Sequence, residues 1–316
     1  MRVIAFKLVK LVAVIFVVSL LTFVMTRNLG GDPVVQKLGP QAGDPESYAA
    51  VEHELGLDRP FVVQYVDWLW NAMQGDLGRS YNNNQEVSKS LQQRLPVTLE
   101  LLILAQLFSI LIAVPLGIYC AYKQNSRIDR VITSMSFGVL SIPGFALAIV
   151  LVYFFAVQWN LVPATGYTRL TEDVGENLRT VFLATVVLTL PLAAVYTRLL
   201  RSDMIANLHE DFILVAKSKG LPTWHILFRH ALRPSSFSLL TVFGINFGTL
   251  LGGSVIVEYL FALPGVGSLA VESIGRRDYL VTQGVVLLIA FAFVIANFVV
   301  DVLYSVLDPR IRRAAG

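Results

Sequence analysis

The sequence predicts an all-α integral membrane protein with six transmembrane helices and a helical external loop after the first span. Hydrophobic residues make up 55% of the 316-residue chain and charged residues only 15%, whereas a soluble domain carries about 25% charged residues. The apolar residues gather in runs long enough to cross a bilayer, which takes roughly 20 residues. Lysines and arginines concentrate in alternate loops between these runs, as in multi-pass membrane proteins.

Six apolar stretches are predicted to span the membrane. The first is shortened because Lys10 leaves only Leu11–Thr26 free of charge, but a lysine near a helix end can reach the interface. A signal peptide is the alternative there, yet no small-residue cleavage site follows. Prolines inside spans, at Pro115, Pro143 and Pro191, are expected to kink them. The predicted spans are Leu8–Thr26, Leu95–Tyr122, Val131–Trp159, Leu178–Thr197, Phe237–Val257 and Tyr279–Leu303.

The distribution of positive charge predicts the orientation. One set of termini and loops holds fifteen lysines and arginines, and the short loops of the other set hold four. Cytoplasmic loops carry the excess, so both termini and the loop of residues 198–236 are predicted to be cytoplasmic. The chain then divides into an N-terminal helix (residues 1–28), an external helical loop (29–94), a five-helix core (95–307) with a cytoplasmic loop (198–236), and a cytoplasmic tail (308–316).

Two outer segments carry helix signals. Asp44 and Pro45 predict the start of a helix and Gly56 lies just past its end, while bulky apolar residues at helical spacing follow Pro60. The later segment "VEYLFALPGVGSLAVESIGRRDYL" contains a glycine pattern that also occurs in dinucleotide sites, but it follows a membrane span instead of a strand, which excludes that use. We therefore expect a tight turn at Pro264 and Gly265 and a re-entrant or surface helix after it.

The most informative stretch is "DFILVAKSKGLPTWHILFRHALRPS", residues 211–235, between two apolar runs. An apolar stripe of Met204, Leu208, Phe212 and Val215 predicts one amphipathic helix. Gly220 suits the left-handed residue that ends this first helix, and Pro222 prevents the helix from continuing. Thr223 can cap a second helix, and Pro234 is expected to end that second helix. The resulting hairpin, with its tip at Lys219–Thr223, could lie flat on anionic lipid or receive force from a soluble partner.

Catalytic patterns are missing from the sequence. No second histidine completes a zinc-protease helix, and no G-x-x-x-x-G-K-[ST] loop exists for ATP. The single cysteine, Cys120, excludes a disulfide framework. Polar residues inside spans are costly, and Glu100, Gln106, Asn246, Asn297 and Asp301 stand out. Glu100 and Asp301 lie near helix ends and could reach the interface, whereas a hydrogen bond between helices is the simplest use for Asn246 in the middle of its span. Asn246 and Asn297 are also candidates to line a transport pathway.

The chain resembles, nearly end to end, permease subunits of the ATP-binding-cassette importers for dipeptides, oligopeptides and nickel. The matching segments are "TFVMTRNLGGDP", "LGLDRPFVVQYVDWLWNAMQGDLGRSY", "LPVTLELL", "VEYLFALPGVGSLAVESIGRRDYL" and "YSVLDPRIRR". The hairpin resembles that superfamily's coupling loop, although Leu214 and Val215 depart from it. This resemblance implies a type I importer permease fold that forms half of a translocation pathway for peptides, with nickel complexes or glutathione-like compounds as alternative substrates.

The resemblance also implies partners and roles for particular residues. The partners are a second, homologous permease in a heterodimer, one or two ATPase subunits that hold ATP and Mg, an extracytoplasmic binding protein and membrane lipid; no cofactor, metal or nucleic acid is expected on this chain, which is not an enzyme. The hairpin residues implied in ATPase coupling are Asp211, Phe212, Ala216, Lys219, Gly220, Leu221, Pro222 and Trp224. The residues expected at an outer gate or binding-protein docking surface are Asp67, Trp68, Asp76, Glu258, Phe261, Pro264, Gly265 and Asp278.

Two other classes of function can be weighed against this one. A self-contained secondary transporter would show inverted repeats or buried ion pairs within one chain, and the sequence shows neither. A membrane enzyme would need a catalytic set, and none is present.

Overall fold

The computed structural model describes residues 2–28 and 32–307. The described part of the chain is helical, and its only extended pairing is an isolated bridge between Arg79 and Glu86. The chain forms two compact units. The first comprises Met1–Thr98 and Leu263–Ile295, and the second comprises Leu99–Ala262 and Ala296–Gly316.

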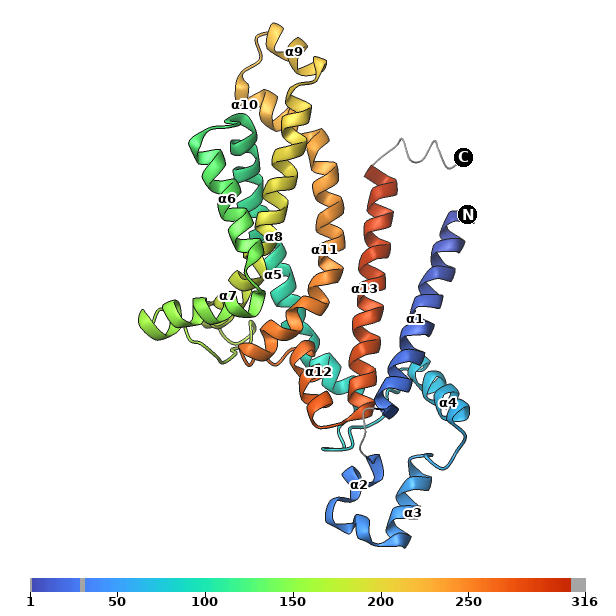
Figure 1. Ribbon diagram of the computed structural model, residues 1–316. Helices are drawn as coiled ribbons and strands as arrows, with labels where there is room; N and C mark the ends of the chain where they lie inside the picture. The colour runs from blue at the N-terminus through green and yellow to red at the C-terminus, as the bar shows by residue number, and fades with distance from the viewer. Residues whose placement is uncertain (1, 29–31, 308–316) are drawn as a thin grey trace. The chain divides into compact units, whose positions relative to one another are not determined.

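The first unit contains the first helix, the loop that follows it and most of the last helix (Figure 1). One apolar cluster, Phe23, Tyr65 and Trp68, joins α1 to α4, and another joins the start of α5 to α12 and α13. Its elements are α1 (Arg2–Asn28), α2 (Pro33–Leu38), η1 (Gly39–Gly43), α3 (Pro45–Glu54), α4 (Phe61–Met73), the first part of α5 (Val87–Tyr122), α12 (Val266–Gly275) and most of α13 (Tyr279–Leu307).

The helix signals of the external loop are confirmed. The Asp44 carboxylate accepts a hydrogen bond from the Ser47 N–H and Pro45 begins α3, as expected for an N-cap followed by proline. Gly56 follows the end of α3 with a φ of 63°. α4 begins directly after Pro60. The helix predicted after Pro264 and Gly265 is also present, as α12, with Gly265 at its N-cap.

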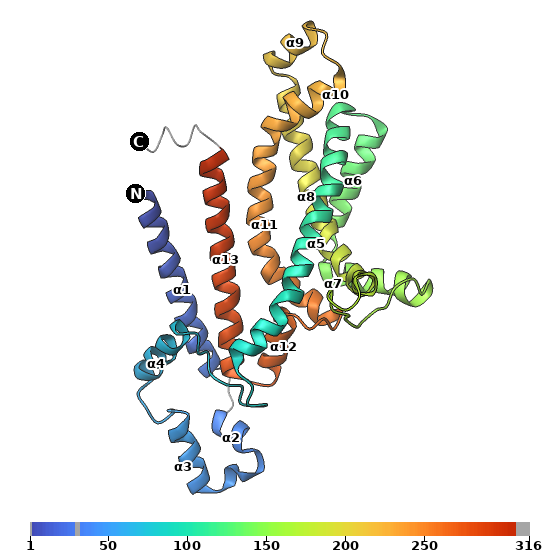
Figure 2. The ribbon, with the colours of Figure 1, turned by 180° about the vertical axis from the view of Figure 1, so that it is seen from behind.

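In the second unit, α5, α6, α8 and α11 lie side by side in both views, while α7 and η2 turn away from them (Figures 1 and 2). α8 contacts both α6 and α11, so it is the central helix of this unit. The further elements of the unit are α6 (Arg127–Ser141), α7 (Gly144–Leu151), η2 (Val152–Gln158), α8 (Val174–Leu208), α9 (Asp211–Ser218), α10 (Thr223–His225), η3 (Ile226–Ala231) and α11 (Leu232–Leu260).

Only one of the three prolines expected to kink a span separates two helices. The helices Arg127–Ser141 and Gly144–Gln158 meet at Pro143 with a bend of 105°, and Ile142 before the proline is extended, as the proline ring requires. α5 continues through Pro115 and α8 continues through Pro191.

The span count falls short of the six predicted from the sequence. Within residues 2–28 and 32–307, four helices are long and apolar enough to cross a membrane, and the bent pair at Pro143 is a fifth if it is one span. α1 holds a shorter apolar stretch, Leu11–Arg27, close to the charge-free stretch expected. Several helices also exceed their apolar runs: α5 begins at Val87 and α8 continues to Leu208.

Candidate functional site

The hairpin between α8 and α11 has a rigid tip. At the end of α9 the Gly220 N–H donates to the Lys217 carbonyl at 2.9 Å, and the Leu221 N–H donates to the Ala216 carbonyl at 3.3 Å. These two bonds form the Schellman motif that closes a helix. The φ of Gly220 is 73°, a left-handed conformation that glycine adopts without steric cost. The predicted role of Gly220 in ending the helix is confirmed.

The second arm of the hairpin differs from the prediction at both ends. Pro222, not Thr223, occupies the cap position, and no side chain caps the helix. Pro234 does not close the arm, because one helix continues from Thr223 to Leu260. The π-helical turn η3 ends at Ala231, and Pro234 is the third residue of α11, so the missing N–H of the proline falls in the turn that follows the π-helical shift of the hydrogen-bond pattern. The hairpin therefore passes directly into a membrane helix.

The hairpin has one buried and one exposed apolar face. Ile213, Ala216, Ile226 and Leu227 are buried. The exposed face carries large apolar side chains that are only partly covered, and Trp224, whose ring contacts that of His225, is 65% exposed. These exposed residues are Phe212, Leu214, Val215, Trp224 and Phe228. Five large apolar side chains on so small an element form a surface suited to a partner.

The apolar stripe predicted from Met204 to Val215 is wrong. α8 ends at Leu208 and α9 begins at Asp211, so the helical phase is reset between them. Met204 is fully buried in α8, whereas Phe212 and Val215 lie on the exposed face of α9. Of the other predicted coupling residues, Asp211, Lys219 and Pro222 are exposed, Leu221 is partly buried and Ala216 is buried.

Polar contacts fasten the base of the hairpin. The Asn207 amide near the end of α8 donates to the Ser235 hydroxyl of α11 at 3.0 Å. Six residues earlier, Arg201 of α8 forms an ion pair with Asp129 at the start of α6. Motion of the hairpin would therefore be passed to α6, α8 and α11. Nothing in the sequence identifies Asp129 as the partner of Arg201; the local signal at Asp129 is its position three residues after the cap Ser126.

The polar residues inside the helices of the second unit meet in a buried cluster. The Gln106 amide donates to the Phe243 carbonyl at 3.2 Å, and the Tyr196 hydroxyl donates to the Gln106 carbonyl oxygen at 2.9 Å. Asn246 lies within hydrogen-bonding reach of the same Tyr196 hydroxyl. The cluster links α5, α8 and α11, which fits the helix-to-helix use expected of Asn246. Tyr196 was missed because a tyrosine within an apolar run carries no polar signal of its own.

The remaining polar candidates are placed separately. Glu100 accepts a hydrogen bond from the Tyr167 hydroxyl at 2.8 Å, so it anchors the loop before α8. Burial raises the pKa of Tyr167, and the Glu100 carboxylate adds to the effect. Asn297 lies partly buried in α13, and its pathway role stays a prediction. The side chain of Asp301 lies outside the described residues.

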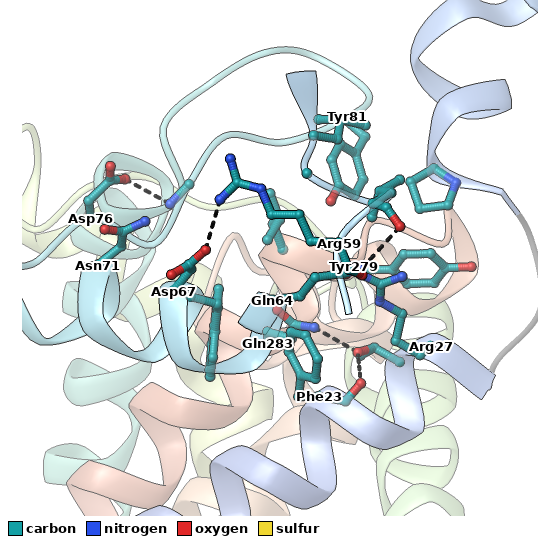
Figure 3. Close-up of a pocket in the computed structure, with 18 of the residues that line it drawn as sticks. Phe23, Arg27, Arg59, Gln64, Asp67, Asn71, Asp76, Tyr81, Tyr279 and Gln283 are labelled. Atoms are coloured by element: carbon teal, nitrogen blue, oxygen red, sulfur yellow. Dashed lines mark hydrogen bonds and ion pairs between the residues drawn. The ribbon is translucent and has the colours of Figure 1, made fainter. Parts of the chain in front are cut away.

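In the first unit, a cavity of about 560 Å³ gathers residues from α1, α4, the loops beside α4 and the start of α13. Figure 3 shows Arg59 paired with Asp67 of α4, and Arg27 of α1 lying beside Tyr279 of α13. The Arg59–Asp67 distance is 3.0 Å and both side chains are about half exposed, at 53% and 49%. Burial raises the pKa of Tyr81, which lines this cavity, to about 12.

The outer residues predicted for docking divide into exposed and buried groups. Asp67 and Asp76 are exposed, although Asp76 also accepts a hydrogen bond from the Gly78 N–H. Trp68, predicted as an interface anchor, is only 8% exposed, because it packs on Phe23 and Tyr65. The prediction that Trp68 is an exposed docking contact is therefore wrong. Its neighbour Trp70 is 61% exposed.

Most of the predicted residues around Val257–Asp278 are also buried. In the second unit, Glu258 is fully buried, with Ser254 as one partner, and Phe261 is buried. In the first unit, Gly265 is buried and Asp278 accepts hydrogen bonds from Ser80 and Asn82. Pro264 alone of this group is exposed. The buried residues hold loops in place and offer no surface contact to a docking protein; a role in an outer gate stays a prediction.

The described residues show no arrangement for metal chemistry. Within residues 2–28 and 32–307, no group of three or more histidine, cysteine, aspartate or glutamate side chains could hold a metal ion. Cys120 is buried. The features with functional potential are thus the exposed apolar face of the hairpin and the polar cavity beside α4.

Two family models match the chain. Residues 113–313 match the binding-protein-dependent transport system inner membrane component, and residues 1–102 match the N-terminal part of a binding-protein-dependent transport system membrane component. The two matches meet within α5 and together extend over both compact units.

Similar proteins extend over nearly the whole chain. A protein of Brucella abortus (strain 2308), provisionally named a peptide transport system permease protein, is 39% identical over 97% of this chain and 97% of its own. A di/tripeptide transport system permease protein of Pseudomonas aeruginosa is 37% identical over 98% of both chains. A dipeptide transport system permease protein of Escherichia coli (strain K12) is 35% identical over 93% of this chain and 94% of its own.

The fold is similar to that of a solved transporter. A chain of the MetNI methionine ABC transporter, in inward facing conformations, matches 69% of this chain and 96% of its own with a TM-score of 0.57 and 19% identity.

Proposed function

The chain belongs to the family of binding-protein-dependent transport system inner membrane components, and from this premise we propose that it is the permease subunit of an ATP-driven importer of short peptides. The observation that carries the proposal is similarity over almost the full length to permeases named for peptides and dipeptides. Nickel complexes and glutathione-like compounds are the alternative substrates. A second, homologous permease completes the pathway, because this chain supplies only half of it.

The exposed apolar face of the hairpin is the surface that docks an ATPase subunit. Trp224 and Phe212 are exposed on either side of the tip, and the Schellman turn holds the two arms in one geometry. ATP and Mg are bound by the ATPase subunits, which is consistent with the missing phosphate-binding loop. Closure of the ATPases pushes the hairpin, and the continuous helix Thr223–Leu260 carries the push into the membrane, a rigid-body route to alternating access.

The external loop of residues 29–94 receives the binding protein. Asp67 and Trp70 of α4 are exposed; Trp70 supplies an aromatic anchor, a residue type enriched at protein interfaces, and Asp67 supplies a charge for the polar rim. This assignment places both termini and the hairpin in the cytoplasm, the loop of residues 29–94 outside, and the chain in a bacterial inner membrane. The distribution of lysine and arginine supports the orientation.

Transport by the assembled importer tests the proposal. The permease is purified with its second permease, ATPase subunits and binding protein, reconstituted in vesicles, and given labelled di- and tripeptides or nickel. The expected result is peptide uptake that needs both ATP and the binding protein. Peptide uptake by this chain alone, driven by an ion gradient, would show that the protein is a secondary transporter. ATP-dependent uptake of nickel without uptake of peptides would contradict the assignment of peptides as the substrate.

Capture of the binding protein tests the outer surface. Asp67→Asn should weaken capture of the peptide-loaded binding protein in a pull-down, because the substitution removes an exposed charge and its pair with Arg59. Glu46→Gln is the matched control, since Glu46 is an exposed carboxylate of α3 in the same loop. Equal capture by Asp67→Asn and the unmodified chain would remove α4 from the docking surface.

A further inference from the structure

A second cavity, of about 530 Å³, opens between α6 and α8 in the second unit. Neither the coupling hairpin nor the predicted pathway residues contribute to it. Two arginines and two hydroxyl groups share its wall with apolar side chains. Its lining residues are Thr133, Phe137, Val195, Arg198, Leu199, Arg201 and Ser202.

Arg198 is the cation of this cavity that has no carboxylate partner among the residues the structure describes. Its guanidinium carbon lies 4.0 Å from the centre of the Phe137 ring. Stacking on an aromatic face holds a guanidinium flat and leaves its N–H edge available for two parallel hydrogen bonds to an anion. Arg201 differs, because Asp129 already neutralises it. The cavity therefore carries one positive charge ready for an anionic ligand.

The cavity lies where a phospholipid headgroup would meet the protein. Arg198 directly follows the apolar run of α8 that ends at Thr197, so it stands at the boundary between apolar and polar chain. α6 continues the wall of the cavity with an exposed apolar surface. On the face of α6 that carries Thr133 and Phe137, the exposed large apolar side chains are Phe137 and Leu140, with exposures of 52% and 37%. The polar pocket can hold a lipid headgroup, and the acyl chains of the same lipid can cover the apolar ridge beside it.

We propose that this cavity binds the phosphodiester group of an anionic phospholipid. Arg198 pairs with the phosphate oxygens, Ser202 and Thr133 donate hydroxyl hydrogen bonds, and the acyl chains lie along α6. Basic pockets between membrane helices bind such headgroups because local charge attracts them and the apolar wall covers the chains. The apolar ridge favours a lipid over a soluble phosphate compound. The site goes beyond peptide transport, and it is independent of which substrate the importer carries.

Lipid retention by the purified full-length chain tests the site. Phosphatidylglycerol, phosphatidylcholine and soluble glycerol 3-phosphate are titrated separately, and bound lipid is counted by native mass spectrometry while the melting temperature is followed. Phosphatidylglycerol should be retained and should raise the melting temperature. Arg198→Gln should weaken this retention by roughly ten- to a hundredfold, the range for a lost hydrogen bond to a charged group. Arg198→Lys keeps the positive charge but lacks the planar guanidinium, so its retention of phosphatidylglycerol should lie between that of the unmodified chain and that of Arg198→Gln.

Arg127→Gln is the matched control, because Arg127 is exposed at the same end of α6 but does not line the cavity. It should retain phosphatidylglycerol as the unmodified chain does. Equal losses in Arg127→Gln and Arg198→Gln would show a diffuse attraction to negative charge and overturn the site. Equal stabilisation by glycerol 3-phosphate would overturn the lipid as ligand, and so would loss of retention once the whole importer is assembled.

Discussion

Arg201 of α8 holds Asp129 of α6 through two hydrogen bonds, from Nε to Oδ1 at 2.6 Å and from Nη2 to Oδ2 at 2.8 Å. The Asp129 carboxylate is almost completely buried, with a side-chain exposure of 2%, and Arg201 is 24% exposed. The Asn125 N–H donates a further hydrogen bond to the same carboxylate at 2.8 Å. This pair is the strongest polar link between α6 and the helix that leads into the hairpin.

Removing one partner of this pair should destabilise the protein. Arg201→Met leaves a buried carboxylate without its cation, which typically costs about 3–5 kcal/mol, and lowers the melting temperature of the purified permease. The double variant Arg201→Met with Asp129→Leu should recover much of the loss, because no charge is then left buried. A double variant as unstable as Arg201→Met would contradict the importance of the unpaired charge.

Gly220 should tolerate asparagine better than valine. The φ of 73° is the constraint, since no atom lies within 4 Å of a Cβ placed there. A left-handed conformation costs about 1–2 kcal/mol in ordinary residues, and asparagine adopts it more readily than a β-branched residue. Gly220→Val should be present in the membrane at normal level but uncouple ATP hydrolysis from transport, whereas Gly220→Asn should keep most transport. Unchanged transport by Gly220→Val would exclude the tip as the coupling element.

Truncation of the exposed hairpin side chains should weaken ATPase docking. Burial of one large apolar side chain contributes roughly 1.5–3 kcal/mol, so Trp224→Ala should lower the affinity for the ATPase subunit by about ten- to a hundredfold. Binding of the purified ATPase to the permease in detergent gives this affinity. Trp159→Ala is the matched control, because Trp159 is 56% exposed outside the hairpin. Equal affinities for Trp224→Ala and the control would favour the alternative in which the hairpin lies on lipid.

Cysteine labelling should establish the orientation. A cysteine at the exposed Gln124, in the loop before α6, should be protected from an impermeant thiol reagent on cells with an opened outer membrane, and one at the exposed Glu46 should react. The native Cys120 is buried and provides the unreactive background. Reaction at position 124 with protection at 46 would reverse the topology and with it the assignment of the hairpin to the ATPase side.

The sequence by itself determined the features that depend on neighbouring residues in the chain. Apolar runs produced helices because a membrane leaves the backbone no other partners for its hydrogen bonds. Asp44 with Pro45 began a helix, Gly220 ended one, and Pro143 broke another, since each residue acts on its own backbone within a turn. The resemblance to importer permeases also came from short segments of the amino-acid sequence.

Only the tertiary structure decided which side chains are available and which are paired. Trp68 and Asp278 were expected at the surface, but Trp68 packs on Phe23 and Asp278 accepts hydrogen bonds from Ser80 and Asn82, and both are buried by these distant segments of the chain. Periodicity placed Phe212 and Val215 on one stripe with Met204, and the break after Leu208 separated them. The partner of Arg201 lies on another helix, and the cavity of Arg198 exists only where α6 and α8 meet. Such contacts depend on the close approach of residues distant in the chain, which local sequence patterns do not encode.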